Sequence, residues 1–245
     1  MNIIESVNNS KIVELKKLQD KKTRQIEKKF LVEGYHLVEE AKKHNLLDYI
    51  LTTNKNDFNK YNIDGYLVNQ KIIDKLSTTT SAQSIIGVVN MQSQEYDLSK
   101  FKKIVLLDNV NDPGNLGTII RTSAALGIDC VITSMDTVDI YNEKVIRATQ
   151  GSIFKIPVLK CDLTKVIKEL KRNNIKVFAT SLNTNNEIKD IKNLDKFAIV
   201  FGNEANGVKK EVFDLVDETF KIKMYNDVES LNVAIACAIC IYHLS

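Results

Sequence analysis

Beyond residue 100, short apolar runs alternate with amphipathic stretches of helical period, and this alternation limits the possible folds more than any other feature. We predict strands at 104–107, 130–133, 176–180 and 197–201, a further short strand at Ile222, and helices at 115–126, 142–149, 162–173, 208–216 and 230–243. Short, continuously apolar strands separated by helices are typical of a parallel sheet covered on both faces. The predicted fold class of residues 100–245 is therefore α/β with a parallel sheet.

The first 95 residues show a smaller and less regular α/β pattern. We expect helices at 10–20 and 35–44, a basic loop between them, and strands at 30–32, 49–52, 66–68 and 84–90. The stretch 91–100 is polar and has no clear period, which is typical of a connection between domains. We therefore predict two domains, residues 1–95 and residues 100–245.

Composition narrows the class of protein. With 44% hydrophobic and 27% charged residues, the 245-residue chain is typical of folded proteins with a core. The first residues lack a basic start followed by an apolar core, and the longest uncharged stretch, 230–245, is short for a membrane span. Without a secretion signal, the four cysteines favour reduced thiols: Cys130, Cys161, Cys237 and Cys240. We expect a cytoplasmic protein that is not embedded in a membrane.

Charge is unevenly distributed. The net charge of +3 is too small to indicate nucleic-acid binding by itself. Residues 11–29, however, contain eight Lys or Arg and three acidic residues. Such a segment can neutralise RNA phosphates, and it can equally be a solvated helix face followed by a Lys-rich loop.

Three polar loops follow predicted strands in the second half of the chain. They are DNVNDPGNLGTIIR at 108–121, FGNEANGV at 201–208 and MYNDVESLN at 224–232. In parallel sheets, ligands bind beyond the carboxyl ends of the strands, where such loops meet helix N-termini. The density of Asn, Asp, Glu and Gly in them predicts a functional site.

Common nucleotide-binding motifs fit these loops poorly. Gly202 and Gly207 have the spacing of a phosphate-binding loop, but Val208 stands where that loop requires Lys. Gly114 and Gly117 do not complete a G-x-G-x-x-G dinucleotide fingerprint. The glycines are equally explained by tight turns and helix starts.

A metal site and a hydrolase are also poorly supported. Cys237, Cys240 and His243 have a spacing that suits zinc, but they lie in an apolar predicted helix and no second cluster supplies a fourth ligand. We therefore interpret them as core residues and expect no metal. His36 and His44, the other histidines, lie outside the polar loops, so no Ser–His or Cys–His pair is indicated.

Taken together, the three loops resemble the motifs of the SpoU/TrmH family of RNA methyltransferases, a branch of the SPOUT superfamily. The N-x-G-x-x-x-R of the first motif matches Asn115, Gly117 and Arg121. The G-x-E-x-x-G of the second matches Gly202, Glu204 and Gly207, and the S-L-N-V of the third begins at Ser230. Residues 21–41 also resemble the substrate-binding domain that precedes the catalytic domain in many members. The sequence departs from the pattern at Ala234, where many members carry a second Ser.

The resemblance implies a fold and an activity. The fold is a parallel-sheet α/β domain with a deep trefoil knot, preceded by a small α/β ribosomal-protein-like domain that binds RNA. The activity is methyl transfer from S-adenosylmethionine to a ribose 2′-hydroxyl, and the expected substrate is 23S ribosomal RNA. By position, the cofactor-binding residues are Thr180, Ser181, Leu182, Phe201, Gly202, Asn203, Ile222, Met224, Ser230 and Leu231.

The catalytic residues implied by the motifs are Arg121, Asn115, Glu204, Ser230 and Asn232. A guanidinium is a poor base, so we expect Arg121 to hold the target phosphate and stabilise the developing alkoxide. Glu204 would orient Arg121 through a bidentate pair. The two asparagines would orient the hydroxyl or nearby loops, and they also suit helix caps, as does Ser230. Without the resemblance, Arg121 is equally a surface helix residue.

The implied partners are RNA and a second copy of the chain, joined through the knot domain so that the arginine reaches the partner's cofactor. The RNA-binding residues we expect are Lys21, Lys22, Arg24, Lys28, Lys29 and Arg147. Two alternatives stay open at this point. The substrate can be a tRNA, or the chain can be an RNA-binding knot protein without catalytic activity.

Overall fold

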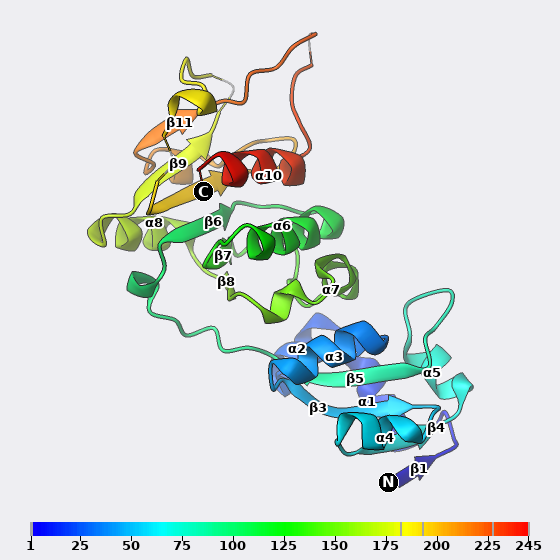
Figure 1. The fold of residues 1–245 in the computed structure, drawn as a ribbon. Coiled ribbons are helices and arrows are strands. Elements are labelled where there is room, and N and C mark those ends of the chain that lie inside the picture. Colours follow the sequence, from blue (N-terminus) through cyan, green and yellow to red (C-terminus); the bar gives the residue numbers. More distant parts are fainter. Residues whose placement is uncertain (1, 182, 193, 227, 245) are drawn as a thin grey trace. The chain divides into compact units, whose positions relative to one another are not determined.

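The structure is a computed structural model that describes residues 2–181, 183–192, 194–226 and 228–244 (Figure 1). It divides into two compact units. Unit 1 contains the residues up to Gln92 together with Tyr141–Phe154, and unit 2 contains Ser93–Ile140 and the residues from Lys155 onward. The domain limits expected from the sequence, 1–95 and 100–245, stay a prediction.

Unit 1 is built on a five-stranded mixed sheet in the order β1-β4-β3-β5-β2. The strands are β1 (Asn2–Ile4), β2 (Lys29–Glu33), β3 (Leu47–Thr52), β4 (Gly65–Val68) and β5 (Ile85–Asn90). β5 runs antiparallel to β2 and β3, whereas β1, β3 and β4 are parallel. The carboxyl ends of β2, β3 and β4 therefore lie at one edge of the sheet, next to the start of β5.

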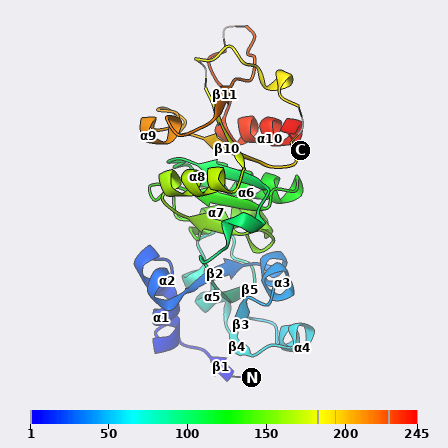
Figure 2. The ribbon, with the colours of Figure 1, turned by 90° about the vertical axis from the view of Figure 1, so that its left-hand side faces the viewer.

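Helices cover both faces of this sheet. They are α1 (Ser10–Lys17), α2 (Lys21–Glu27), α3 (Tyr35–Lys43), α4 (Asn56–Tyr61), α5 (Gln70–Leu76) and α7 (Glu143–Thr149). Figure 2 shows α1 and α2 on one side and α3 and α4 on the other. α7 and the short 3-10 helix Ser152–Phe154 belong to this unit because the ring of Phe30 lies 4.7 Å from that of Tyr141 and 6.3 Å from that of Phe154.

Unit 2 is built on a six-stranded sheet in the order β11-β9-β10-β6-β7-β8, and every pairing in it is parallel. The strands are β6 (Lys103–Leu107), β7 (Cys130–Thr133), β8 (Val158–Lys160), β9 (Lys176–Thr180), β10 (Phe197–Phe201) and β11 (Glu218–Phe220). The parallel α/β fold class is confirmed. The trefoil knot stays a prediction.

The helices of unit 2 lie on the two faces of its sheet. They are α6 (Pro113–Ala125), α8 (Leu163–Arg172), α9 (Lys210–Phe213) and α10 (Val233–Leu244), with 3-10 turns at Leu98–Lys100 and Ile188–Asp190. α6 and α10 pack side by side (Figure 1). The apolar side of α8 packs on the opposite face, against alternate strand residues such as Ile104, Leu106 and Val200, since successive side chains of a strand point to opposite faces.

Several short elements differ from the prediction. The basic segment expected as a loop forms α2, because Asp20 accepts a hydrogen bond from the Thr23 backbone (3.0 Å) and caps the helix. β1, α4, α5 and β8 were not predicted, and three to seven residues leave little room for a periodic pattern. Ile222 lies beyond β11, which ends at Phe220, so the strand expected at Ile222 is wrong. The helix expected at 208–216 is the single turn α9.

In the part of the chain that the structure describes, no helix has both the length and the apolarity needed to cross a bilayer. The apolar α10 has 12 residues, which gives a length of about 18 Å against an apolar bilayer thickness of about 30 Å.

Candidate active site

The loops that follow β6 and β10 meet because these strands are neighbours in register. Leu107 pairs with Phe201 at their carboxyl ends, and the Asp108 backbone N–H donates to the Phe201 carbonyl (2.8 Å). The third loop leads into α10, whose packing on α6 places it beside the first. Three segments that are far apart in the sequence therefore meet at one edge of the sheet.

A chain of hydrogen bonds joins one side chain from each loop. The Asn115 amide nitrogen donates to Glu204 Oε1 (2.9 Å), and the Asn232 amide nitrogen donates to Asn115 Oδ1 (2.9 Å). Asn115 is fixed because its backbone N–H donates to Asp112 Oδ1 (2.7 Å), the N-cap of α6. The structure thus brings together three of the five side chains that the motifs singled out.

Asn232 also begins the last helix. Its Oδ1 accepts hydrogen bonds from the backbone N–H of Ala234 (2.9 Å) and of Ile235 (3.3 Å). The N-cap function considered for Ser230 therefore belongs to Asn232, two residues later. Ser230 is exposed and lies on the wall of the cavity described below.

Arg121 occupies a different position from the one expected. Its side chain is exposed on α6, on the stripe that also carries Thr118 and Ala125. Within the described residues, Arg121 has no ion pair or hydrogen bond through its side chain, and Glu204 is bonded to Asn115 instead. Within the single chain Glu204 therefore pairs with Asn115, because α6 directs Asn115 towards the second loop, and the Glu204–Arg121 pair stays a prediction.

The second loop folds back on itself, which explains its two glycines. The backbones of Asn203 and Gly207 exchange hydrogen bonds of 3.0 and 2.9 Å. A Cβ at Gly202 would lie 2.1 Å from the carbonyl carbon of Gly207 and 2.3 Å from the Val208 nitrogen. Gly207 has a φ of +68°, a backbone conformation that favours glycine. The absence of a side chain at Gly202 is thus required by the loop's own backbone.

Asp108 is a buried residue that supports this loop and to which no role was assigned from the sequence. It is 1% exposed, and its Oδ2 accepts the backbone N–H of Lys209 (2.7 Å). The Asn203 amide nitrogen donates to the neighbouring carbonyl of Asn109 (2.9 Å). The Lys209 ammonium pairs with Asp136, whose pKa is lowered by that hydrogen bond. An acidic residue at a strand end was the only sequence signal for Asp108.

A cavity of about 590 Å³ opens next to the hydrogen-bonded chain. This volume lies within the range of small-molecule sites, about 300–1,000 Å³. Its walls include nine of the ten residues expected to bind the cofactor: Thr180, Ser181, Phe201, Gly202, Asn203, Ile222, Met224, Ser230 and Leu231. The tenth, Leu182, lies outside the described residues.

The lining of this cavity has a distinct chemistry. Phe201, Ile222 and Leu231 provide apolar surface, which suits a planar heterocycle. Glu204 and Glu229 add carboxylates to the same wall, which suits a cationic group. The residues present therefore fit S-adenosylmethionine, which combines an adenine ring with a sulfonium charge.

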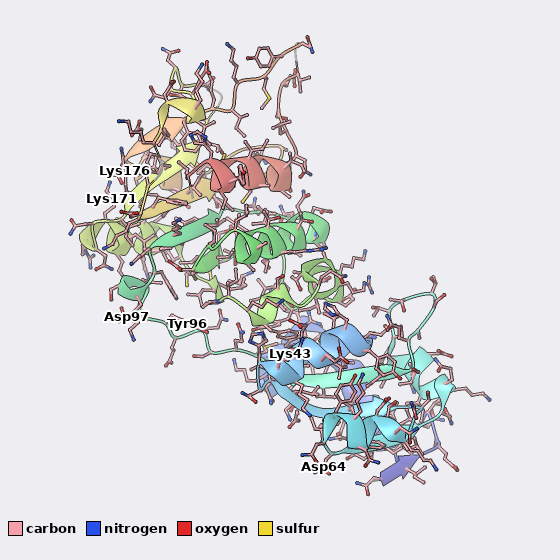
Figure 3. All side chains as sticks on the ribbon, in the orientation of Figure 1. Lys43, Asp64, Tyr96, Asp97, Lys171 and Lys176 are labelled. Carbon is pink, nitrogen blue, oxygen red and sulfur yellow. The ribbon has the colours of Figure 1, made fainter. Side chains whose placement is uncertain are left out.

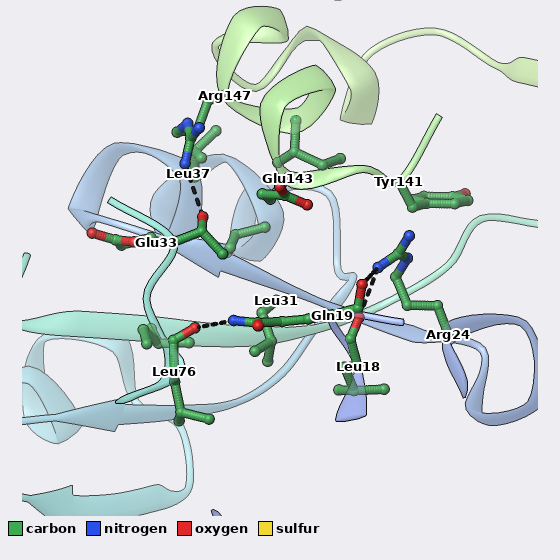
Figure 4. Close-up of a pocket in the computed structure, with 14 residues that line it drawn as sticks. Leu18, Gln19, Arg24, Leu31, Glu33, Leu37, Leu76, Tyr141, Glu143 and Arg147 are labelled. Carbon is green, nitrogen blue, oxygen red and sulfur yellow. Dashed lines mark hydrogen bonds between the residues drawn. The ribbon is translucent and has the colours of Figure 1, made fainter. Parts of the chain in front are cut away.

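The predicted RNA-binding residues of unit 1 differ in exposure. Lys21, Lys22 and Lys28 are exposed on or beside α2, and Lys29 is half-buried and pairs with Asp48 (2.7 Å). Arg24 is only 4% exposed, and its guanidinium donates to the carbonyls of Leu18 (2.9 Å) and Gln19 (2.8 Å) (Figure 4). The prediction that Arg24 binds RNA is therefore corrected, because its buried guanidinium donates to backbone carbonyls inside the unit.

Arg147 and a small cavity lie nearby in unit 1. The Arg147 guanidinium is half-buried and donates to Thr78 Oγ1 (2.9 Å). The cavity in Figure 4 is lined by Arg24, Glu33 and Arg147 among others and has a volume of about 40 Å³. Such a volume accommodates a few water molecules and no larger ligand.

The two cysteines of α10 are core residues, and His243 is partly buried. Cys237 and Cys240 are buried, and burial raises the pKa of the Cys240 thiol to about 12. The His243 ring nitrogen Nε2 lies 2.9 Å from the Ile191 carbonyl oxygen. Across the described ranges, no group of three His, Cys, Asp or Glu side chains is arranged to hold a metal ion.

Comparison with protein families divides the chain into two matches. Residues 102–242 match the SpoU rRNA Methylase family, and residues 9–87 match the MRM3-like substrate binding domain. The first match contains all three loops and the walls of the cavity. The second contains α2 and most of the sheet of unit 1.

Individual proteins are similar over the whole length. The chain is 38% identical to the 23S rRNA (guanosine(2553)-2'-O)-methyltransferase RlmP of Bacillus subtilis, and the alignment covers 100% of this chain and 99% of the relative. An rRNA methyltransferase structure from Sinorhizobium meliloti has a TM-score of 0.88 at 28% identity and covers 99% of this chain and 96% of its own. Its AdoMet-bound structure has a TM-score of 0.87 at 26% identity, with 99% and 97% covered.

Proposed function

Because this chain belongs to the SpoU rRNA methylase family, we propose that it transfers a methyl group from S-adenosylmethionine to a ribose 2′-hydroxyl of RNA. The observation that carries the proposal is the hydrogen-bonded chain Glu204–Asn115–Asn232 beside the cavity. Glu204 belongs to both the chain and the cavity wall, so the polar groups and the cofactor site share an edge.

The cavity residues would bind the cofactor, which when bound supplies an electrophilic methyl group on a sulfonium. Apolar walls at Phe201, Ile222 and Leu231 would enclose the adenine, and Thr180 and Ser181 offer hydroxyls and backbone groups. Glu204 or Glu229 would stabilise the positive charge. Holding donor and acceptor in one geometry can lower the barrier by several kcal/mol, on the order of 7–11 in favourable cases.

Arg121 would stabilise the ribose oxygen as it loses its proton. A guanidinium stays protonated at neutral pH, so its contribution is electrostatic and the proton leaves to a phosphate oxygen or to water. The exposed position of Arg121 on α6 leaves the side chain accessible to RNA. Asn115 and Asn232 would hold the three loops together through their hydrogen bonds. Ser230 would contact the cofactor or the ribose.

We further propose that the chain acts as a homodimer. Ile235, Ile239 and Tyr242 are exposed and share one face of α10, at helical spacing. The exposed stripe of α6 with Arg121 lies on the neighbouring helix. A two-fold contact through these helices would cover the apolar side chains and bring each Arg121 to the cavity of the partner subunit.

The RNA is best assigned as ribosomal, and specifically as 23S rRNA. Two findings favour ribosomal RNA over a tRNA. Residues 9–87 match a substrate binding domain, and the whole chain is similar to a 23S rRNA methyltransferase. Lys21, Lys22, Lys28 and Lys29 would supply phosphate contacts, with Arg147 as a further candidate. A cytoplasmic location, expected from the four free cysteines, is part of the same proposal.

Two measurements test the activity. Titration calorimetry with S-adenosylmethionine and with its demethylated product should show binding, and absence of binding to both would refute the enzyme and favour an RNA-binding protein. Mapping of 2′-O-methyl groups should show one ribosomal position that is lost when the gene is deleted. Loss of a tRNA methyl group instead would replace the proposed substrate.

The arrangement across the dimer is tested by mixing two inactive variants. Arg121→Ala lacks the arginine, and Leu231→Trp fills the cavity, which calorimetry would verify. If Arg121 acts on the partner's site, random mixing should restore about a quarter of the wild-type activity, because half of the dimers are mixed and each has one complete site. No restored activity in verified mixed dimers would show that Arg121 acts within its own subunit.

A further inference from the structure

The loop between β11 and α10 exposes a tyrosine to which the proposed reaction gives no role. Tyr225 is 69% exposed and Val228, three residues later, is 50% exposed. The large aromatic side chains Phe178 and Phe220 of the same unit are buried in its core. An exposed aromatic and aliphatic pair beside a ligand site is a typical contact surface for a binding partner.

The backbone at Tyr225 takes part in a local hydrogen bond. The Val228 backbone N–H donates to the Tyr225 carbonyl (3.4 Å), which closes a turn. Asn226, inside that turn, has a φ of +58°, and Asn is among the residues that tolerate this left-handed conformation. Tyr225 therefore stands at the start of a tight turn.

A lysine covers one face of the tyrosine ring. The ammonium nitrogen of Lys223 lies 5.4 Å from the ring centroid of Tyr225, within the range of a cation–π contact. Because a planar ring has two faces, the exposed ring keeps a second face for a stacking partner. The lysine places a positive charge on the opposite side of the ring from that partner.

The neighbours of Tyr225 connect it with the cofactor cavity. Lys223, Met224 and Val228 line an open hollow whose other walls are Glu187, Lys221, Ile222 and Glu229. Met224, Ile222 and Glu229 also line the cofactor cavity. Tyr225 belongs to the loop that ends in Asn232. A ligand that stacks on Tyr225 would thus lie at the rim of the cofactor cavity.

We propose that Tyr225 stacks on the base of the unpaired RNA nucleotide that enters the site, while Lys223 contacts an adjacent phosphate. This inference rests on the proposed function. Proteins recognise unpaired RNA by stacking bases on aromatic side chains and by placing cations near phosphates. The aromatic face and the positive charge match both halves of a nucleotide, whereas a purely apolar protein contact would leave Lys223 to be desolvated.

The first test compares variants of Tyr225 in RNA methylation at saturating S-adenosylmethionine. Tyr225→Ala should raise KM for the RNA about 5- to 100-fold, since one base–aromatic stack contributes about 1–3 kcal/mol. Tyr225→Phe and Tyr225→Trp should restore KM to near the wild-type value, because both keep a stacking face. The cofactor Kd measured by calorimetry should be unchanged in all three.

Tyr96→Ala is a matched control, because Tyr96 is also a partly exposed tyrosine of unit 2. It is 39% exposed and is labelled in Figure 3. Its ring packs on Phe101 with centroids 6.0 Å apart, and it lies outside the three loops in the sequence. Its replacement should leave KM for the RNA unchanged. An equal rise in KM for Tyr96→Ala and Tyr225→Ala would overturn the proposal.

Lys223→Ala tests the phosphate contact separately. The slope of log KM against log salt should decrease by about 0.7, the value for one phosphate contact on single-stranded RNA. An unchanged slope would remove Lys223 from the proposal.

The remaining outcomes separate this inference from the proposed function. If the wild-type protein neither binds the cofactor nor methylates RNA, the proposed function fails. If it methylates RNA and Tyr225→Ala is equally active, only the stacking inference is overturned. A fall of Tyr225→Ala from dimer to monomer in sedimentation would likewise overturn it, because Tyr225 would then be a subunit contact.

Discussion

The carboxyl edges of the two sheets both carry polar loops, but they use their polar atoms differently. In unit 1, Glu33 accepts hydrogen bonds from the hydroxyls of Ser77 and Thr79 (both 2.7 Å), and Asp57 accepts one from Tyr35 (3.2 Å). These bonds hold the loops to one another. In unit 2, Glu204 is bonded to Asn115 and also lines a cavity large enough for a ligand.

This comparison shows that polar loops at a strand end do not by themselves make an active site. A cavity of ligand size and side chains that face it are also needed, and among the described residues of unit 1 the cavity beside Glu33 has about 40 Å³. The difference favours chemistry in unit 2 and RNA docking in unit 1.

Arg121→Ala should reduce kcat about 100- to 1,000-fold, because one electrostatic stabiliser of the developing negative charge is removed. The melting temperature should not change, since the side chain is exposed. Labelled methyl transfer to ribosomal RNA measures the rate. Thr118→Ala, on the same exposed stripe of α6, should retain full activity, and a fully active Arg121→Ala would refute the role of Arg121.

Asn115→Ala should lower kcat/KM about 10- to 100-fold, because it removes a bond to a carboxylate, which contributes about 1.5–3 kcal/mol. Adding Asn232→Ser, which keeps a capping oxygen for α10, should cost little more, because the chain is already interrupted at Asn115. A double-mutant cycle measures this coupling, and fully additive losses would argue against a connected chain. Asn111→Ala is the control, since among the described residues its amide bonds only Asn109 (3.3 Å).

In unit 1, replacing the buried Arg24 should change the stability, whereas replacing the exposed Lys21 or Lys22 should change the salt dependence of RNA binding. Arg24→Met should lower the free energy of unfolding by about 1–3 kcal/mol, because one buried and one partly buried carbonyl lose their donor. Its RNA affinity should keep the wild-type salt dependence. Lys21→Ala and Lys22→Ala should instead leave stability unchanged. Each should reduce the slope of log binding constant against log salt concentration by about 1. Urea unfolding and RNA binding at several salt concentrations distinguish the two, and a reversed pattern would contradict the assignment.

Asp217 should give a small dependence of stability on pH. Burial opposes ionisation of its carboxyl, but hydrogen bonds from Lys171 (2.8 Å) and from the Val177 backbone (2.8 Å) outweigh it and lower the pKa. Lys171 is labelled in Figure 3. A lowered pKa stabilises the folded state above the unfolded value of about 3.9, and this contribution disappears as pH falls through the folded pKa.

Asp217→Asn should therefore be less stable than wild type at pH 7, by about 1 kcal/mol or less for a partly exposed pair. The difference in melting temperature should shrink below about pH 4. Asp64→Asn, which changes an exposed carboxylate of unit 1, should show no such trend. A constant difference down to pH 3 would contradict the assignment to Asp217.

The sequence by itself determined the parallel α/β class and the three loops, and the family resemblance of those loops implied nine residues that line the cavity. Apolar runs such as 104–107 and 197–201 have local periods that identify strands, and parallel strands put the loops that follow at one edge. The order of the motifs then indicated the family, whose membership the full-length similarity supports.

Only the tertiary structure decided how the side chains are paired and buried. Glu204 bonds Asn115, 89 residues away, and Asn115 bonds Asn232, 117 residues away. Arg24 has the same sequence environment as its exposed lysine neighbours but is buried. These outcomes depend on which distant segments pack together, because burial and hydrogen bonding are set by neighbours in space, whereas local periodicity records only the neighbours along the chain.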